Sequence, residues 1–409
     1  MRESDSLRGK TRLLVVGHGA AATGFSRVLH GIITHLPLDY EVRHLAVNHR
    51  QERVAVPWPI WGNPRRGDMH GVERLVELLE HWRPHLILIM GDIWFCTAHA
   101  QRLNMVWPRP LVVAYCPVDG EILAPEMVLP LRLFQRVVAY NHFGLAEMAR
   151  AARRAGGELR NLAIIPHGRD ACFAPINQVR HDLLARSEAK ATLWGPELAG
   201  PDSFVVLNAN KHQPRKRLDL TLEGFGLFAR EKPAGVRLYL HTWLDKEGPH
   251  LKEIAQRLGL ERRLIFTPGA QQGHPTQDDA WLNRLYNACD VGVNTSGGEG
   301  WGLVSFEHAA TGAPQIVPDH SSCGELWTGG GVLLKARESF DHPGLKLRWR
   351  FIHPPDLAEA LEKLYQDCDY RRQMAYRALE WAQRPELDWS NVAGLWHKLL
   401  QEVLHEASK

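Results

Sequence analysis

Short runs of consecutive apolar residues alternate along the chain with segments long enough to form helices. The runs consist mainly of Val, Ile and Leu, which is typical of parallel strands that are buried on both faces. In the first half the predicted strands cover residues 12–16, 40–47, 86–90, 111–115, 137–140 and 162–165. In the second half they cover residues 204–208, 236–240, 264–267, 290–293, 314–317 and 332–334.

This alternation predicts an α/β protein with two doubly wound, Rossmann-like domains. A chain of 409 residues is also too long for one small hydrophobic core. We expect residues 1–172 to form the first domain and residues 173–384 the second, with a polar linker around residues 172–186. Because ligands of such sheets bind beyond the carboxyl ends of the strands, a central cleft between the two domains is the expected site.

Residues 385–409 carry the pattern of an amphipathic helix. Ser390 is the expected N-cap. We expect this helix to return to the first domain and to pack on it. Its apolar stripe comprises Val392, Leu395, Trp396, Leu399 and Leu400.

The overall composition is that of an ordinary soluble protein, with 44% hydrophobic and 23% charged residues. The net charge of +3 does not indicate specific nucleic-acid binding. Residues 1–172 contain 21 Lys and Arg against 16 Asp and Glu, a net charge of +5, which leaves −2 for the rest. This basic bias is compatible with an anionic acceptor or with a peripheral contact with the inner face of a membrane. The alternative explanation is an ordinary scatter of charged residues over the surface.

The six cysteines are dispersed and form no C-x-x-C pair, which indicates reduced thiols in a cytoplasmic protein. The first ten residues are charged and lack the apolar region of a signal peptide. No apolar run approaches the roughly 18 residues of a membrane-spanning helix.

The strongest candidate site lies in residues 294–307, NTSGGEGWGLVSFE, directly after a predicted strand. Glu299 lies in a glycine-rich turn, and Glu307 lies on the helix that we expect to begin at Leu303. Two carboxylates and a helix N-terminus suit a ligand with hydroxyls and phosphates, such as a nucleotide sugar. The backbone N–H groups expected to meet this ligand belong to Gly300, Trp301, Gly302 and Leu303.

A second candidate lies in residues 208–219, after the first strand of the second domain. Four cations, Lys211, Arg215, Lys216 and Arg217, follow one strand end, where they repel each other. A bound diphosphate would offset this repulsion through charge-assisted hydrogen bonds. The alternative interpretation is a solvated run of charge.

The first domain offers weaker candidates. Gly19 and Gly24 belong to a loop of small residues after the first strand, which either approaches a ligand or forms a tight turn. Asp119 follows another strand of this domain and is either a base for an acceptor hydroxyl or a turn residue. The remaining polar residues at strand ends are as easily structural, and they are Asp92, His18, His142 and His167.

We expect no metal site, because no D-x-D motif follows a strand. A P-loop is absent as well, which argues against a kinase or NTPase of that type. Charge on a leaving group would then be met by Lys and Arg.

Taken together, these motifs resemble the retaining GT-B glycosyltransferases of family 4, the glycosyl transferases group 1. Residues 296–325 resemble the family's E-G-[FW]-G-L-x-x-x-E stretch, and residues 165–175 resemble its I-P-x-G-V-D-x-x-x-F-x-P junction. The family's G-R-x-x-x-x-K-G motif is similar to residues 210–217. There Lys211 and Lys216 take the cationic positions, while Asn210 and Arg217 replace the glycines.

The resemblance implies a GT-B fold and a hexosyltransferase that uses a UDP- or GDP-linked sugar, retains anomeric configuration and needs no metal or other cofactor. It implies that Glu299 binds the donor sugar and Glu307 the ribose. Lys211 and Lys216, with Arg215, would neutralise the diphosphate. The loop with Gly19 and Gly24 would lie near this diphosphate.

Asp119 falls where many members carry a histidine on the acceptor side, so its role is open. The acceptor would be a glycan, a lipid or a small molecule. Two alternatives remain open, which are a non-catalytic sugar-nucleotide-binding protein of the same fold and a sugar-nucleotide epimerase.

Overall fold

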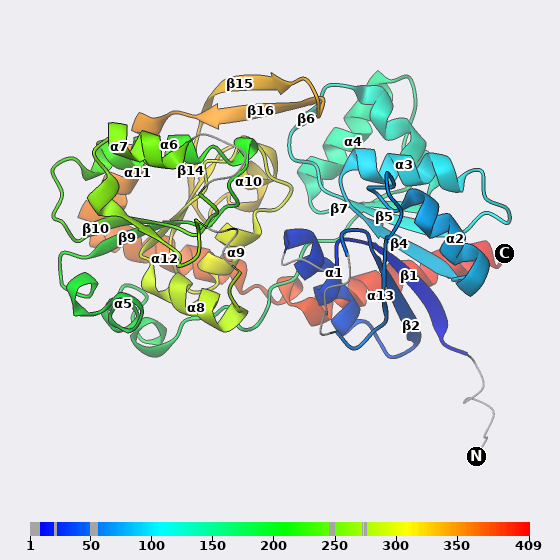
Figure 1. The fold of residues 1–409 in the computed structure, drawn as a ribbon, viewed down its shortest axis with the longest axis horizontal. Coiled ribbons are helices and arrows are strands. Elements are labelled where there is room, and N and C mark those ends of the chain that lie inside the picture. Colours follow the sequence, from blue (N-terminus) through cyan, green and yellow to red (C-terminus); the bar gives the residue numbers. More distant parts are fainter. Residues whose placement is uncertain (1–8, 20–22, 50–55, 245–249, 272, 274–275) are drawn as a thin grey trace, which may run out of the picture. The chain divides into compact units, whose positions relative to one another are not determined.

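The computed structural model describes residues 9–19, 23–49, 56–244, 250–271, 273 and 276–409. It divides into two compact units (Figure 1). Unit 1 comprises Met1–Val118, Ala124–Gly168 and Glu386–Lys409, and unit 2 comprises Asp119–Leu123 and Arg169–Pro385. Each unit is built around a parallel sheet with helices, as the alternation of strands and helices predicts.

The sheet of unit 1 has the order β3-β2-β1-β4-β5-β7-β8, and all its strand pairs are parallel. Its central strands are fully buried, which explains their unbroken apolar sequences. The strands are β1 (Thr11–Gly17), β2 (Tyr40–Ala46), β3 (Ile60–Gly62), β4 (Leu86–Met90), β5 (Val112–Cys116), β7 (Arg136–Ala139) and β8 (Leu162–Ile164).

Side-chain caps begin two of the helices of unit 1. Thr23 Oγ1 accepts from the backbone of Ser26, and Asn141 Oδ1 accepts from the backbone of Gly144. The helices are α1 (Gly24–His35), α2 (Val72–Trp82), α3 (Ile93–Leu103), η1 (Pro125–Leu133), α4 (His142–Arg154) and α13 (Trp389–Ala407).

The C-terminal helix α13 belongs to unit 1 and packs on α1. Trp389 fills the space above two glycines: a Cβ atom added at Gly31 or Gly168 would lie 2.3 or 2.2 Å from its ring. Two details of the prediction are wrong. The N-cap is Asp388, which lies two residues before the predicted Ser390. Leu395 is exposed, although the other residues of the apolar stripe are buried.

The main sheet of unit 2 is also parallel, with the order β11-β10-β9-β12-β13-β14. Its strands are β9 (Phe204–Asn208), β10 (Val236–Leu240), β11 (Leu264–Phe266), β12 (Val291–Val293), β13 (Gln315–Pro318) and β14 (Val332–Leu334). All twelve predicted strands of the two sheets are present, within one or two residues at each end.

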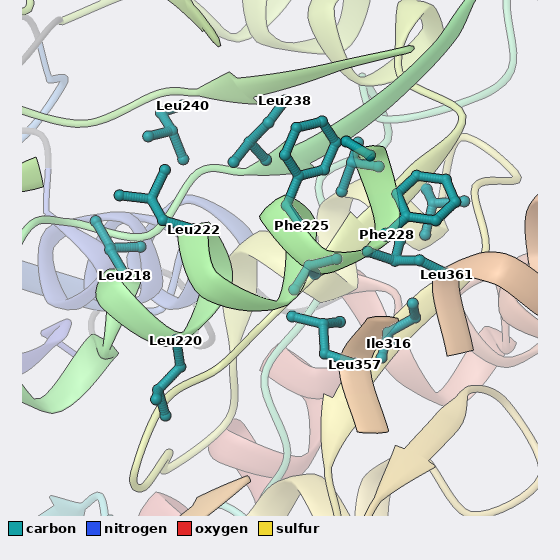
Figure 2. Close-up of a cluster of buried hydrophobic side chains, with 14 of the residues drawn as sticks. Leu218, Leu220, Leu222, Phe225, Phe228, Leu238, Leu240, Ile316, Leu357 and Leu361 are labelled. Carbon is teal, nitrogen blue, oxygen red and sulfur yellow. The ribbon is translucent and has the colours of Figure 1, made fainter. Parts of the chain in front are cut away.

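Leu, Ile, Val and Phe side chains from α6, α11 and the sheet form the core of unit 2 (Figure 2). The two helices approach closely at Gly224, where an added Cβ would lie 2.7 Å from Leu357. The helices of unit 2 are η2 (Asn177–Arg180), α5 (Ser187–Trp194), η3 (Pro196–Leu198), η4 (Pro214–Lys216), α6 (Leu218–Ala229), α7 (Leu251–Arg257), η5 (Glu261–Arg263), α8 (Asp279–Ala288), α9 (Leu303–Ala309), α10 (Ser321–Leu326), α11 (Pro354–Gln366) and α12 (Cys368–Ala382). The short helix η6 (Pro385–Leu387) crosses the boundary from unit 2 to unit 1.

Unit 2 also contains a small antiparallel sheet that the sequence did not predict. Its strands β15 (Ala336–His342) and β16 (Leu347–Ile352) form a hairpin, and β6 (Glu121–Ile122) pairs with β16. The segment Asp119–Leu123 is thereby joined to unit 2, although the chain on both sides of it belongs to unit 1.

The predicted linker around residues 172–186 is instead an integral part of unit 2. Arg186 is fully buried and donates to backbone carbonyls on three sides. Burial lowers the pKa of Arg186 to about 10, so its guanidinium stays charged at neutral pH. The carbonyls that it binds belong to Leu183, Tyr286, Asn287, Thr311 and Gly312.

Among the described residues, no helix is both long and apolar enough to cross a bilayer.

Candidate active site

The candidate site of unit 2 lies where the strand order of its sheet reverses. The chain runs from β9 outward to β10 and β11, then returns to add β12 on the other side of β9. In open α/β sheets such a reversal leaves a crevice at the carboxyl ends of the two strands. The cationic segment follows β9 and the glutamate-bearing turn follows β12, so the two strongest sequence motifs meet at this point.

A chain of buried hydrogen bonds joins the two segments beneath the site. Asn208 Nδ2 donates to Thr221 Oγ1 over 2.8 Å, and Thr221 Oγ1 lies 2.8 Å from Thr295 Oγ1. Thr295 in turn bonds the carbonyl oxygens of Lys216 and Arg217, at 3.1 and 2.8 Å. The backbone of the cationic segment is therefore fixed to the turn that carries Glu299.

Arg217, the last cation of this segment, pairs with a carboxylate other than Glu299. Arg217 has φ 47° and ψ 50°, a left-handed conformation that glycine adopts more easily, and the resembled family has glycine here. Its guanidinium binds Asp219 through Nη2 at 2.7 Å and lies 4.2 Å from the centre of the Phe351 ring. Arg217 is thus engaged away from Glu299.

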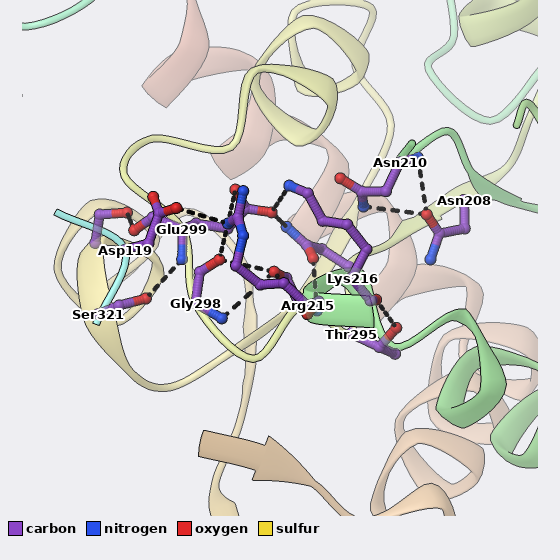
Figure 3. A network of polar contacts seen from close by, with 12 residues as sticks. Asp119, Asn208, Asn210, Arg215, Lys216, Thr295, Gly298, Glu299 and Ser321 are labelled. Carbon is purple, nitrogen blue, oxygen red and sulfur yellow. Dashed lines mark hydrogen bonds and ion pairs between the residues drawn. The ribbon is translucent and has the colours of Figure 1, made fainter. Parts of the chain in front are cut away.

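Glu299 lies at the centre of an ion cluster (Figure 3). Lys216 Nζ contacts its Oε1, and Arg215 Nη1 lies 3.4 Å from its Oε2. Asn294 Nδ2 donates to Oε1 over 3.3 Å. Arg215 also donates to the carbonyl oxygen of Gly298, the residue before Glu299. Two of the three cations that were predicted to bind a diphosphate therefore pair with the predicted sugar-binding carboxylate.

Two serines that were not among the predicted site residues hold the backbone of Glu299. Ser321 Oγ accepts from its N–H over 3.2 Å, and the Ser322 hydroxyl donates to its carbonyl oxygen. Both belong to the start of α10. Only the fold brings this helix to the turn.

Asp119 completes the cluster from a distant part of the sequence. Its Oδ2 lies 3.3 Å from Arg215 Nη1, and its backbone lies directly above Gly298. The prediction that assigned Asp119 to the first domain is wrong, because β6 draws this segment into unit 2.

The cluster shifts the pKa values of its members in different directions. Burial alone would raise the pKa of Glu299, but Lys216 and Arg215 outweigh it and hold this pKa at about 2. Burial lowers the pKa of Lys216, although Glu299 opposes the shift. Burial raises the pKa of Asp119, and the charge of Glu299 adds to this rise while Arg215 opposes it. Glu299 is thus firmly ionised, and Asp119 is the more readily protonated carboxylate.

Glu307 lies on α9, which begins at Leu303 as predicted, after Gly302 in a left-handed conformation with φ 90°. Its carboxylate is buried, and the Tyr286 hydroxyl donates to its Oε2 over 3.2 Å. Gly300 offers its N–H to the Asp119 carboxylate. Trp301 is buried, with its ring 5.6 Å from that of Phe306, so only its backbone is available to a ligand.

Lys211 is not part of the cluster. Its side chain is exposed and makes no hydrogen bond or ion pair with the part of the chain that the structure describes. The family resemblance placed Lys211 on a phosphate-binding arginine, whereas Arg215 is the residue that reaches Glu299.

Apart from Asp119, the candidates of the first domain lie in unit 1. The Gly19 N–H donates to Asn48 Oδ1 over 3.0 Å, and Gly24 is the first residue of α1. Residues 20–22 of the same loop lie outside the described residues. His167 is buried, with Nδ1 2.8 Å from the Tyr115 hydroxyl, and burial lowers its pKa to about 3. This supports the structural interpretation of His167.

The other candidates at strand ends of unit 1 show no common site. The ring of His18 lies 5.5 Å from that of Phe25, His142 is exposed, and Asp92 precedes α3 at its N-cap position.

Unit 2 also contains a cavity of about 660 Å³ along α6, with Arg217, Glu223, Arg230 and Arg257 among its lining residues. None of the residues that form the ion cluster around Glu299 lines this cavity. We therefore assign the candidate site to the cluster, where carboxylates and cations converge. Among the described residues, no group of three or more His, Cys, Asp or Glu is arranged to hold a metal ion.

Residues 203–367, most of unit 2, match the family model of the glycosyl transferases group 1. The chain is 26% identical over 319 residues to D-inositol 3-phosphate glycosyltransferase of Nocardia farcinica, which covers 75% of this chain and 62% of that protein. It is 30% identical over 128 residues to mannosylfructose-phosphate synthase of Agrobacterium fabrum, which covers 30% of this chain and 26% of that protein. The chain thus spans less than two thirds of the length of both relatives.

Solved structures share the fold over nearly the whole chain. The Anabaena protein Alr3699/HepE, in complex with UDP and glucose, superposes with a TM-score of 0.68 at 19% identity, covering 96% of this chain and 100% of that one. Sucrose-phosphate synthase from Thermosynechococcus elongatus superposes with a TM-score of 0.69 at 16% identity, covering 97% and 100%.

The fold is therefore that of the GT-B glycosyltransferases, with two Rossmann-like domains, as predicted. The family match covers residues 203–367, and it agrees with the resemblance of this part of the chain to the glycosyl transferases group 1. Membership of family 4 and retention of configuration stay predictions.

Proposed function

We propose that this protein is a retaining glycosyltransferase that moves a hexose from a UDP- or GDP-linked sugar to a hydroxyl acceptor without a metal ion. One observation carries the proposal: Glu299 is paired with Lys216 and Arg215 at the point where the strand order of the sheet reverses. Carboxylate and cations at one crevice fit the two ends of a nucleotide sugar, its hydroxyls and its diphosphate. The Anabaena protein of the same fold binds UDP and glucose, which supports the same class of ligand.

Lys216 and Arg215 would stabilise the departing nucleoside diphosphate. Negative charge grows on the diphosphate as the glycosidic bond breaks, and preorganised cations stabilise that charge more in the transition state than in the ground state. Both side chains are mostly shielded from water, where electrostatic interactions are stronger than in bulk solvent. Two adjacent cations supply charge that a metal ion supplies in other enzymes.

Glu299 and Glu307 would bind the other two parts of the donor, the sugar and the ribose. Glu299 is ionised and acts as an acceptor for sugar hydroxyls once the diphosphate has taken over its cations. Glu307 would accept from the ribose hydroxyls. The backbone N–H groups of Gly302 and Leu303, at the start of α9, would add to the binding of phosphate.

Asp119 would take up the proton of the acceptor hydroxyl. Its raised pKa suits a general base better than an ordinary carboxylate does. Activity that depends on ionised Asp119 is lost as the pH falls through this raised value, above the ordinary 3.8. The acid limb of the pH–rate profile is the measurement that checks this role.

Peripheral membrane contact stays a prediction. In unit 1 the loop after α3 exposes Met105 and Trp107, at 78% and 91% of their surfaces. An exposed Trp beside basic residues suits a bilayer interface, and co-sedimentation with anionic vesicles checks it.

The proposed function is tested by measuring release of UDP or GDP from a panel of sugar nucleotides, with and without hydroxyl acceptors. We expect release with at least one donor, and a Lys216→Ala variant that binds this donor about tenfold or more weakly, because a charge-assisted contact is lost. Lys232→Ala is the matched control, since Lys232 forms an ion pair with Glu362 in the same unit. No transfer, hydrolysis or binding with any donor would refute the proposal, and it would support neither the epimerase nor the non-catalytic sugar-nucleotide-binding protein. Donor binding without turnover would favour the non-catalytic alternative.

A further inference from the structure

Tyr286 lies behind Glu307, in a helix whose sequence carries no catalytic motif. Its hydroxyl donates to Oε2 of Glu307 over 3.2 Å, and both side chains are buried. A carboxylate offers about four acceptor sites. The hydrogen bond from Tyr286 occupies one of these sites and helps to orient the carboxylate.

The ring of Tyr286 is itself held in place. It lies 5.6 Å from the ring of Phe173 and 5.4 Å from that of His308. With 2% of its surface exposed, Tyr286 has no space to adopt another rotamer. Its hydroxyl thus reaches Glu307 from a fixed point.

Arg186 sets the spacing between the two helices that carry this pair. At the end of α8 it donates to the carbonyls of Tyr286 and Asn287, at 3.1 and 3.0 Å. After α9 it donates to the carbonyls of Thr311 and Gly312, at 3.3 and 2.8 Å. A buried cation at two helix C-termini is favourable, because both ends carry partial negative charge.

Helix α8 is also anchored to the segment by which the chain enters unit 2. The Ala174 N–H donates to Asn283 Oδ1 over 3.2 Å, and the Ile176 N–H donates to Asn287 Oδ1 over 3.0 Å. Asn283 and Asn287 lie on the same helix as Tyr286, on either side of it in sequence, so these bonds hold the part of α8 that carries Tyr286. The hydroxyl that binds Glu307 is therefore positioned by contacts to three separate parts of the chain.

We propose that Tyr286 is a positioning residue that turns the Glu307 carboxylate toward the ribose hydroxyls of the donor, so that the site selects ribose over deoxyribose. This inference rests on the proposed function, in which Glu307 binds the ribose. A carboxylate held by a charge-assisted hydrogen bond keeps its acceptor oxygens at fixed positions. Without that bond it loses the geometry needed to accept from two adjacent hydroxyls at once.

The test compares Tyr286→Phe with Tyr239→Phe by isothermal titration with UDP, 2′-deoxy-UDP and 3′-deoxy-UDP, and with the guanosine series. Tyr239 is the matched control, because its buried hydroxyl lies 3.0 Å from Thr267 Oγ1 in the same unit and the substitution removes the same atom. We expect the wild-type protein to prefer the ribose form by about tenfold or more, because a deoxy analogue leaves a buried carboxylate oxygen without its donor.

In Tyr286→Phe we expect affinity for the ribose form to fall about three- to tenfold while affinity for the deoxy forms changes little, the size of one lost hydrogen bond to a charged group. Tyr239→Phe should keep the wild-type preference. An equal loss for all nucleotides in Tyr286→Phe would reduce Tyr286 to a structural residue and overturn the inference. Wild-type binding without preference for ribose would overturn it as well, while leaving the proposed function intact. If the wild-type protein binds no nucleoside diphosphate, the proposed function fails first.

Discussion

Glu299 holds the two cations that we propose for the donor diphosphate. Lys216 and Arg215 pair with its carboxylate, and Asp119 pairs with Arg215 from the other side. A nucleotide that binds here must compete with Glu299 for these contacts. If Glu299 binds the donor sugar as proposed, the same residue would also limit the affinity of the site for the free diphosphate.

We predict that Glu299→Gln binds UDP or GDP more tightly than the wild-type protein, by about threefold or more, and transfers sugar at least about 100-fold more slowly. The neutral amide releases the two cations to the diphosphate, which gains charge-assisted hydrogen bonds, while the transition state loses a fixed carboxylate. Titration calorimetry of the nucleotide and initial rates of transfer measure the two effects separately. Weaker binding of the free nucleotide in this variant would contradict the competition.

The ion pairs of Glu299 also predict how the stability of the fold changes with pH. The pKa of Glu299 is lowered to about 2, so its ion pairs stabilise the fold fully above its ordinary value of 4.5 and progressively less as the pH falls toward 2. In Glu299→Gln this part of the acid dependence is absent, and unfolding curves measured over that range show it as a flatter slope.

At the level of single residues, the sequence motifs anticipated part of the ion cluster around Glu299. Glu299 and Lys216 were among the candidates because their types and spacing carry information. Lys211 was preferred to Arg215 by counting along a motif, whereas in the structure Arg215 Nη1 lies 3.4 Å from Glu299 Oε2. Tyr286 was missed, since a polar residue inside an amphipathic helix looks the same in sequence whether it faces water or a buried carboxylate.

Among the elements, the turn between β12 and α9 leaves no space for a side chain at two of its glycines. A Cβ added at Gly298 would lie 1.8 Å from the carbonyl oxygen of Asp119, and one at Gly297 would lie 2.6 Å from the Phe351 ring. The turn is thus enclosed by β16 and by the segment that carries Asp119. Glycine is required here for close approach of two backbones.

Gly298→Ala should therefore displace Asp119 from Arg215 and cost about 1–3 kcal/mol of stability, as overpacking of a filled site does. We expect donor turnover to fall by about tenfold or more, measured as release of nucleotide, because small displacements of positioned groups are costly. Gly200→Ala is the control, since nothing lies within 4 Å of a Cβ at that position. Unchanged turnover in Gly298→Ala would show that the enclosure of the turn does not matter.

The strands of the two parallel sheets were predictable because they are buried on both faces, and burial on both faces leaves an unbroken apolar sequence. The hairpin of β15 and β16 was not, because β15 has the sequence ARESFDH and most of it is exposed. β6 contains two residues and has no pattern of its own. Its pairing with β16 depends on a partner more than 200 positions away in sequence, which no local signal reveals.

At the level of the whole molecule, the two units should respond to different changes. Trp389→Ala removes the side chain that fills the space above Gly31 and Gly168 in unit 1. We expect unit 1 to lose about 3–5 kcal/mol, as buried aromatic residues cost when they are truncated to alanine. Unit 2 should keep its stabilisation by a nucleoside diphosphate, because a ligand stabilises only the unit that binds it.

Scanning calorimetry with and without UDP or GDP separates these responses. Trp107→Ala is the matched control in unit 1, since its side chain is 91% exposed and its loss should change stability by less than about 0.5 kcal/mol. A loss of nucleotide-dependent stabilisation in Trp389→Ala would contradict the independence of the two units.

The association of Asp119–Leu123 with unit 2 has a consequence for recombination between related genes. A crossover that exchanges residues 169–385 as one fragment would transfer Glu299, Lys216 and Arg215 but leave Asp119 and β6 with the other parent. The recipient would then place an unrelated segment against Gly298 and opposite Arg215. For this protein, inheritance of an intact site requires two separate pieces of coding sequence, of which the shorter encodes five residues.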